Sequence, residues 1–188
     1  MGAITYYVHP KALVESTEIG HKTRVWAFAH ISSGVVIGDN CNICDHTFIE
    51  RNVWIGNNVT IKSGVYIWDG VRIHNDVFIG PNVTFTNDLR PRSKRYPEKY
   101  LEIIVEQGAS IGANSTIVAG NRIGKYAMVG AGSVVTKAIP NNTLWYGNPA
   151  VFKSYICDCG EKLDDHLSCT KCCSNFKMDT GGLQRITP

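Results

Sequence analysis

Apolar side chains recur at every sixth position along most of this chain. Thirteen positions spaced by six, from Leu13 to Phe85, are all apolar, and ten of them are Ile. The same step returns from Val105 to Val135, and Gly or Asn often follows the apolar residue. An α-helix needs apolar residues every three or four positions and an antiparallel strand alternates with a period of two, so neither explains this pattern.

The six-residue period predicts a solenoid of short strands and tight corners. Each repeat forms one strand, with the Ile in the interior and Gly or Asn in the turn. Three repeats complete one coil of 18 residues. Residues 18 apart in the sequence are therefore expected to stack at the strand spacing of about 4.8 Å.

The repeat unit resembles that of the hexapeptide-repeat acyltransferases: Ile or Val, then Gly, two variable residues, and Val, Ala or Ser. The resemblance extends from about residue 8 to residue 150. It implies an all-β fold, a left-handed parallel β-helix that works as a homotrimer with active sites between subunits. We therefore expect a β-helix acetyltransferase domain over residues 1–150 and a small Cys-rich tail over residues 151–188.

One charged stretch, residues 86–104, interrupts the repeat. It contains five Lys or Arg and three Asp or Glu, a net charge of +2. Because the repeat resumes afterwards, the stretch is expected to leave the β-helix as a loop. In the resembling family such a loop reaches over the neighbouring subunit and walls the active site. Arg90 and Arg92 would then bind phosphates or a sugar carboxylate; alternatively, the loop is only a solvated surface segment.

The segments SGVYIWDG and VTFTNDLRPRS resemble one subgroup of this family, bacterial N-acetyltransferases that acylate the 3-amino group of nucleotide-linked sugars. The resemblance places Asn87 and Asp88 at the sugar, together with an acid 18 residues earlier, Asp69. The 18-residue stacking also puts Asp69 beneath Asn87. Glu50 and Trp68 form a second such ladder, and together these residues are predicted to bind substrate. The alternative for Asn87 and Asp88 is ordinary loop-start chemistry.

The loop contains no histidine, although many hexapeptide acyltransferases use one there as the general base. His46 is the best histidine candidate near the site, and an ordinary corner histidine is an equal alternative. Catalysis is expected to depend mainly on orienting the sugar amine with Asn87 and Asp88. The departing coenzyme A thiolate takes the proton, or Asp88 or His46 relays it.

Small residues at two stacked corners predict the binding surface for acetyl-CoA. The corners at Gly112 and Gly130 lie 18 residues apart, and the later segment WYGNPA resembles the Gly-Asn-Pro-Ala segment that closes the family's β-helix beside coenzyme A. Tight packing of the small residues and solvation of the lysines are the alternatives. The predicted residues are Gly112, Ala113, Gly130, Ala131, Lys137, Asn148, Pro149 and Lys153.

Five of the seven cysteines lie between Cys157 and Cys173. The pairs Cys157-x-Cys159-Gly and Cys169-x-x-Cys172 resemble the two halves of a zinc ribbon, and zinc prefers four thiolate or imidazole ligands in a tetrahedron. Cys173 or His166 could replace one of them. Four cysteine ligands leave no open position, so the zinc would be structural. The alternative is a reduced, disordered tail.

Net charge, apolar runs and the positions of particular residues argue against several other functions. The net charge of +3 is too small to indicate nucleic-acid binding, and no apolar run approaches the length of a membrane span. The N-terminus lacks a signal-peptide pattern, which predicts a cytoplasmic protein with reduced cysteines. A carbonic anhydrase on this fold needs three convergent histidines, yet none lies between His74 and His166. A purely structural solenoid, such as an ice-binding ladder, would repeat Thr on one face and would not need the loop.

The sequence therefore predicts an acetyl-CoA-dependent N-acetyltransferase acting on a dTDP-3-amino-3,6-dideoxyhexose, for a bacterial surface glycan such as the O-antigen. The Cys-rich tail resembles enzymes that act instead on a UDP-2-acetamido-3-amino-2,3-dideoxyglucuronate, which stays an alternative. The configuration at C4 of the sugar and the glycan that receives the product are left open.

Overall fold

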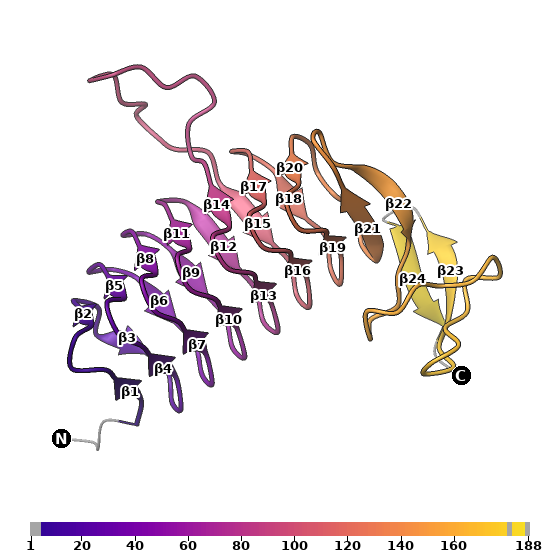
Figure 1. The fold of residues 1–188 in the computed structure, drawn as a ribbon, viewed down its shortest axis with the longest axis horizontal. Helices are drawn as coiled ribbons and strands as arrows, with labels where there is room; N and C mark the ends of the chain where they lie inside the picture. Colours follow the sequence, from indigo (N-terminus) through magenta and orange to yellow (C-terminus); the bar gives the residue numbers. More distant parts are fainter. Residues whose placement is uncertain (1–4, 180–181, 187–188) are drawn as a thin grey trace.

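Short parallel strands stack into three sheets that form the three faces of a β-helix (Figure 1). The computed structural model describes residues 5–179 and 182–186. The first sheet contains β1 (Tyr7–Val8), β4 (Arg24–Val25), β7 (Asn42–Ile43), β10 (Thr60–Ile61), β13 (Phe78–Ile79), β16 (Ser110–Ile111), β19 (Met128–Val129), β21 (Thr143–Tyr146) and β22 (Val151–Tyr155). The second contains β2 (Leu13–Val14), β5 (His30–Ile31), β8 (Phe48–Ile49), β11 (Tyr66–Ile67), β14 (Thr84–Phe85), β17 (Thr116–Ile117) and β20 (Val134–Val135). The third contains β3 (Glu18–Ile19), β6 (Val36–Ile37), β9 (Trp54–Ile55), β12 (Val71–Ile73), β15 (Ile103–Val105) and β18 (Arg122–Ile123).

The sixth-position residues form the core, as the repeat predicts. Ile43, Ile61 and Ile79 pair in register on successive coils and are each completely buried. Because side chains alternate between the two faces of a strand, the residue before each Ile points outward. The predicted all-β solenoid is therefore confirmed. The described residues contain no α-helix, and so none that could cross a membrane.

The interior positions of the first coil are one residue out of step with the repeat in the later coils. Leu13 pairs with His30 and is 55% exposed, whereas Val14 pairs with Ile31 and takes the interior position. The corner between Val14 and Ile19 is one residue shorter than the usual step of six, and Ser16 is buried in it. The Ser16 hydroxyl donates to the carbonyl of Val35 at 2.5 Å. A shift of one residue exchanges the inner and outer faces of a strand, so the prediction that Leu13 fills the core was wrong.

Asparagine and aspartate occupy the corners that need a left-handed backbone. Asn40, Asn58 and Asp76 have φ angles of 54°, 58° and 61° on successive coils. Their side chains form a ladder, in which the Asn40 amide donates to Asn58 at 2.9 Å and the Asn58 amide donates to Asp76 at 3.0 Å. These residues tolerate the left-handed region better than most, which explains their place in the repeat.

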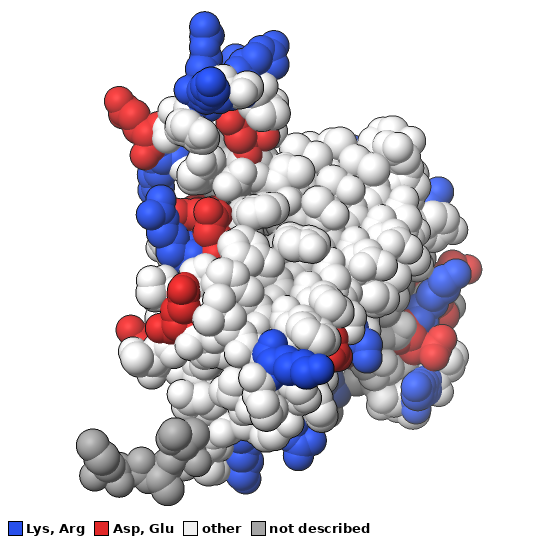
Figure 2. Space-filling view, turned by 60° about the vertical axis from the view of Figure 1, so that its left-hand side comes forward, with Lys and Arg blue, Asp and Glu red and all other residues white. Residues whose placement is uncertain are grey.

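The charged stretch leaves the β-helix as a loop between β14 and β15, as predicted (Figure 1). The stacking continues across it: Val71 pairs with Ile103, and Ile103 and Val105 are buried. The excursion therefore adds residues to one coil without changing which side chains face the core. Charged side chains crowd on this loop (Figure 2).

The first sheet continues past residue 150. β22 pairs antiparallel with β21 and closes the last coil, from Thr143 opposite Tyr155 to Tyr146 opposite Val151. A separate hairpin follows, made of β23 (Asn175–Asp179) and β24 (Gly182–Ile186). The described part of the Cys-rich tail is therefore folded, and residues 180–181 and 187–188 lie outside the described residues.

Candidate functional site

The excursion loop folds around a pocket that contains several of the predicted site residues. The pocket has a volume of about 280 Å³. Three predicted residues, Asn87, Asp88 and Arg90, line it together. The full lining is Asn87, Asp88, Leu89, Arg90, Pro97, Lys99 and Leu101. The structure thus brings these three residues into one place.

Asn87 and Asp88 also hold the base of the loop together. The carbonyl of Asn87 accepts a hydrogen bond from the N–H of Leu101 at 3.3 Å. The Asp88 Oδ1 atom accepts one from the N–H of Arg90 at 2.8 Å, the local turn that Asp commonly forms. Within the described part of the chain, Asp88 Oδ2 makes no hydrogen bond. The turn role predicted as the alternative is present, and it leaves one carboxylate oxygen and the Asn87 side chain at the pocket.

A second pocket of about 480 Å³ lies between the loop and the coils below it. It contains Asp69, and it shares Pro97 and Lys99 with the first pocket. The Asp69 carboxylate accepts from the Asn52 amide at 2.7 Å and lies 3.8 Å from the Arg51 guanidinium, and its backbone N–H donates to Glu50 at 2.9 Å. The lining is Arg51, Asn52, Asp69, Gly70, Tyr96, Pro97, Glu98, Lys99, Tyr100 and Glu102.

Arg51 and Asn52 were missed by the sequence reading, although Arg51 stands 18 residues before Asp69 and the stacking rule could have found it. Lys99, Tyr96 and Tyr100 lie in the loop, where no periodicity guides the reading. These neighbours matter because they set the charge around Asp69. One arginine, one lysine and two glutamates share its pocket.

Four predicted residues of the sugar site do not line either pocket in the described chain: Glu50, Trp68, Arg92 and His46. Glu50 instead accepts a hydrogen bond from the backbone N–H of Asp69. Trp68 packs among the aromatic side chains of the second sheet, with its ring stacked on Tyr66 at 6.2 Å. Arg92 lies near the tip of the loop, where its guanidinium donates to the carbonyl of Pro91. His46 occupies a corner after β7, where it stacks on Phe28 at 4.9 Å. A single chain therefore does not bring His46 to the loop.

The predicted acetyl-CoA residues stack as expected, and packing alone explains the glycines. Ile111 pairs with Val129, so the two corners lie one above the other. A Cβ atom on Gly112 would lie 2.4 Å from the nitrogen of Ala131, which no real side chain tolerates. A Cβ atom on Gly130 would lie 2.7 Å from Cβ of Tyr146. The small residues thus let the last coils close against each other.

The closing hairpin carries the remaining predicted acetyl-CoA residues. Asn148 and Pro149 form its turn between β21 and β22, joined by a cis peptide bond. Lys153 places its ammonium group 4.5 Å from the ring centre of Tyr146. Lys137 lies 5.2 Å from the ring centre of Trp145 in the same way. Two positive charges therefore flank the end of the β-helix.

The two halves of the predicted site lie on opposite edges of the second sheet. Asp69, Asn87 and Asp88 follow strands of the second sheet, at its edge with the third. Gly112 and Gly130 follow strands of the first sheet, at its edge with the second. The outward positions of the second sheet between these edges carry no Lys, Arg, Asp or Glu: Leu13, His30, Phe48, Tyr66, Thr84, Thr116 and Val134.

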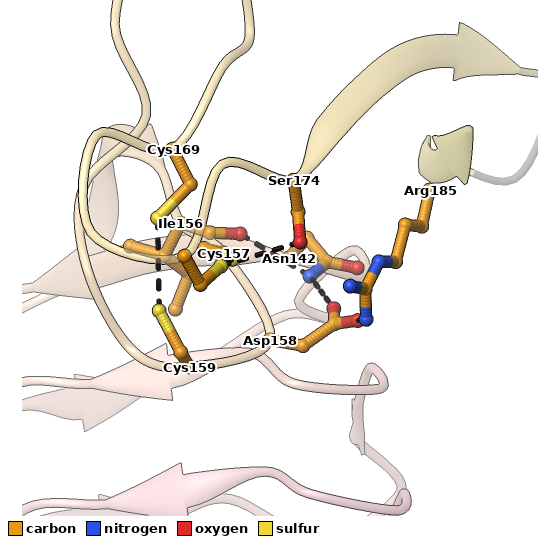
Figure 3. Close-up of polar contacts among 9 residues, drawn as sticks. Asn142, Ile156, Cys157, Asp158, Cys159, Cys169, Ser174 and Arg185 are labelled. Atoms are coloured by element: carbon orange, nitrogen blue, oxygen red, sulfur yellow. Dashed lines mark hydrogen bonds and ion pairs between the residues drawn. The ribbon is translucent and has the colours of Figure 1, made fainter. Parts of the chain in front are cut away.

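Four cysteines of the C-terminal unit converge, and they are the four that the spacing predicted. Figure 3 labels three of them, Cys157, Cys159 and Cys169. The Sγ atoms of Cys157, Cys159, Cys169 and Cys172 all lie within 4.8 Å of one another. The distance is 3.4 Å from Cys157 to Cys172 and 3.7 Å from Cys159 to Cys169, far longer than a disulfide bond. Four sulfurs at about 2.3 Å from a zinc ion lie about 3.8 Å apart in a tetrahedron, so this group fits zinc.

Hydrogen bonds favour the thiolate form at one of these cysteines. The Ser174 hydroxyl, and then the Ser174 backbone N–H, lower the pKa of Cys172 to about 6. Burial raises the pKa of the Cys157 thiol. Among the described residues, Cys173 and His166 do not join the group, so the structure does not support them as replacement ligands.

The sequence matches known hexapeptide proteins along most of its length. Residues 16–51 and 52–87 match the family described as bacterial transferase hexapeptide (six repeats), and residues 102–137 match the hexapeptide repeat of succinyl-transferase. The chain is 61% identical over 184 residues to the dTDP-3-amino-3,6-dideoxy-alpha-D-galactopyranose 3-N-acetyltransferase of Aneurinibacillus thermoaerophilus, covering 97% of this chain and 96% of the relative. It is 34% identical over 144 residues to the galactoside O-acetyltransferase of Lactococcus lactis, covering 73% of this chain and 58% of that one.

Solved structures share the fold at lower sequence identity. A mutant of perosamine N-acetyltransferase from Caulobacter crescentus, in complex with CoA and GDP-perosamine, superposes with a TM-score of 0.52 at 22% identity, covering 78% of this chain and 55% of that one. A mutant of AntD, an N-acyltransferase from Bacillus cereus in complex with dTDP and coenzyme A, gives a TM-score of 0.55 at 17% identity, covering 81% and 83%. These likenesses concern the fold alone.

Proposed function

This chain belongs to the bacterial hexapeptide-repeat transferase family, and we propose that it transfers the acetyl group of acetyl-CoA to the 3-amino group of a dTDP-linked 3-amino-3,6-dideoxyhexose. The observation that carries the proposal is the 61% identity to an enzyme of that activity over nearly the whole of both chains. The pocket that contains Asn87 and Asp88 supports it from the structure. Because the relative acts on the galacto sugar, we propose the same configuration at C4 here.

The reaction joins the amine nitrogen to the thioester carbonyl and breaks the carbon–sulfur bond, and the departing thiolate takes one proton from the amine. Asn87 and Asp88 hold the sugar so that its amine faces the thioester, which supplies much of the rate acceleration. Asp88 Oδ2 is the candidate for accepting a hydrogen bond from the amine, because Oδ1 already accepts from the backbone N–H of Arg90. Asp69 lies across Pro97 and Lys99 from this point and accepts hydrogen bonds from hydroxyl groups of the sugar.

Coenzyme A is proposed to lie along the stacked corners at Gly112 and Gly130, with Lys137 and Lys153 near its phosphates. At its C-terminal end this surface meets the β21–β22 hairpin. AntD, which shares the fold, was solved with dTDP and coenzyme A together, in keeping with a site that takes both ligands.

The separation of the two edges favours a homotrimer with active sites between subunits. One chain places the sugar residues and the coenzyme A corners at opposite edges of its second sheet, so one chain alone does not complete the site. Packing the uncharged second sheets around a threefold axis would bring the sugar edge of one subunit to the coenzyme A edge of the next. His46 lies on the latter edge and would reach a loop only from a neighbouring subunit.

The substitution Tyr66→Glu tests this assembly. Tyr66 points outward from the second sheet and is 48% exposed, and burying a carboxylate in an interface is unfavourable. We expect light scattering to show a shift from trimer to monomer, with loss of acetyl transfer. Phe78→Glu, an outward position of the first sheet with 41% exposure, is the matched control and should stay trimeric. A trimeric and active Tyr66→Glu variant would contradict an interface on the second sheet.

A structural zinc ion is proposed at Cys157, Cys159, Cys169 and Cys172. The four sulfurs already have nearly the separations that a tetrahedral zinc requires. All seven cysteines are free, which suits the reducing cytoplasm in which we place the reaction.

The alternative substrate, a UDP-linked 2-acetamido-3-amino uronic acid, rested on the Cys-rich tail. The alignment with the dTDP-sugar enzyme covers 97% of this chain, so most of the tail is shared with that relative. The tail therefore does not favour the UDP sugar. The product is proposed to enter a bacterial surface glycan such as the O-antigen.

A thiol-release assay tests the proposed function. Acetyl-CoA is incubated with the dTDP-3-amino-3,6-dideoxyhexose of galacto configuration, with its C4 epimer, and with the UDP uronic acid. We expect turnover with the galacto sugar and little with the others. Turnover with the UDP sugar alone would replace the substrate proposal, and turnover with none of them would contradict a sugar N-acetyltransferase.

A further inference from the structure

The C-terminal unit has too small a core to hold itself in place. The cluster of buried apolar residues in this unit consists of Cys157, Cys169, Phe176 and Leu183, so two of the four are members of the cysteine group. Segments of about 40 residues rarely fold on apolar burial alone and usually need a disulfide or a metal. The cysteine group is therefore positioned to supply the missing stability.

The four cysteines come from two different parts of this unit. Cys157 and Cys159 lie in the turn that directly follows β22, whereas Cys169 and Cys172 lie in the segment before β23. Figure 3 shows Cys159 and Cys169 facing each other across the group. A metal bound here would join the end of β22 to the C-terminal hairpin.

The turn after β22 is also bonded to the last coil of the β-helix. Asn142, which is 4% exposed, accepts from the N–H of Ile156 at 2.8 Å and donates to the carbonyl of Ile156 at 3.2 Å. Its amide donates in addition to Asp158 at 2.8 Å (Figure 3). Asp158 lies 3.7 Å from Arg185 on β24, so the same residue contacts both the β-helix and the hairpin.

β22 lies between this turn and the hairpin that we assign to coenzyme A. The strand begins two residues after Pro149, carries Lys153 at its middle position, and ends two residues before Cys157. Within the described residues, β22 pairs with β21 on one side and has no further strand on its other side. A strand at a sheet edge opens more easily than an inner one, so a cross-link at its end strongly affects its order.

We propose that the metal at the four cysteines fixes β22 against the end of the β-helix and thereby sets the affinity of the enzyme for coenzyme A. This inference rests on the proposed function, both for zinc at the cysteines and for coenzyme A at the hairpin. With the metal bound, Lys153 and the turn at Asn148 are held in place before the ligand arrives. Without it, binding coenzyme A must also order β22, which weakens the affinity.

The experiment compares Cys172→Ser with Cys173→Ser. Both residues are exposed and adjacent, but only Cys172 belongs to the group. Zinc content, amide hydrogen exchange of residues 151–155 and the Kd of coenzyme A are measured on each intact protein. For Cys172→Ser we expect loss of zinc, exchange faster by about 10-fold or more, and a Kd weaker by about 5-fold or more. Exchange in the central coils should not change, and Cys173→Ser should match the wild type in every measurement.

Chelation of the folded wild-type protein gives a second route if Cys172→Ser does not fold. Removing zinc should produce the same two changes, and adding zinc back should reverse them. If the protein binds one zinc ion per chain but removing it changes neither amide exchange nor the Kd of coenzyme A, the proposed coupling is overturned and only the zinc site is supported. A wild-type protein that takes up no zinc would overturn the zinc site and the coupling together. Zinc binding without any coenzyme A binding would overturn the assignment of the hairpin.

Discussion

Replacing Asn87 by Ala is expected to lower kcat/KM for the dTDP-linked amino sugar by about 100-fold or more, because a reacting amine that is displaced by about 1 Å loses roughly that factor. The Asn87 side chain lines the pocket of the loop, while its carbonyl closes the base of the loop by accepting from Leu101. Alanine keeps the carbonyl, so the loop and the melting temperature should be preserved. Steady-state kinetics with the amino sugar, together with thermal unfolding, measure the two effects.

Asp88→Asn separates positioning from proton transfer at the same site. Asparagine retains an oxygen that accepts from the N–H of Arg90, as Asp88 does at 2.8 Å, but it has no charge. If Asp88 only positions the sugar, kcat should fall modestly; if it relays the proton, kcat should fall by about 100- to 10,000-fold while sugar binding stays normal. Arg92→Ala is the control for both variants, because Arg92 lines neither pocket in the described structure.

An Asn87→Ala variant as active as Arg92→Ala would rule out this pocket as the sugar site.

Gly112→Ala is expected to destabilise the fold by about 3 kcal/mol, more than the same change at Gly132. A Cβ atom at Gly112 would meet backbone atoms of the next coil, at 2.4 Å from the Ala131 nitrogen and 2.8 Å from the Ala131 Cα. Backbone in a stacked sheet cannot move aside as a flexible side chain can, so the last coils must separate locally. Denaturant unfolding with both variants provides the measurement.

Gly132 is the matched control because its backbone conformation, and not the space around it, disfavours a side chain. Its φ is +69°, which disfavours alanine, but a Cβ atom there would meet nothing within 4 Å. Its cost should be about 1 to 2 kcal/mol, that of placing a non-glycine residue in the left-handed region. If Gly132→Ala were the more costly variant, backbone conformation rather than close stacking would govern these corners. Gly112→Ala should also weaken coenzyme A binding if the ligand lies along this surface.

Sequence reasoning located part of the site because stacking converts sequence separation into distance. Asp69 and Asn87 are 18 residues apart and line adjoining pockets that share Pro97 and Lys99. Arg92 and His46 were also predicted for the site, but they line neither pocket, each for a different reason. Arg92 lies in the loop, whose path follows no repeat, and His46 lies on a different edge of the β-helix from the loop.

The sequence by itself determined the three-faced solenoid, the place where the loop leaves it, and the four cysteines that gather in the tail. It did so because contacts in a solenoid join residues at a constant separation, so a periodic pattern is also a contact pattern. Only the tertiary structure decided that Val14 and not Leu13 enters the core, since both are apolar and the buried Ser16 corner sets the register. It also decided that the sugar residues and the coenzyme A corners occupy opposite edges of one sheet, because the edge on which a residue lies depends on how the chain closes each coil in three dimensions.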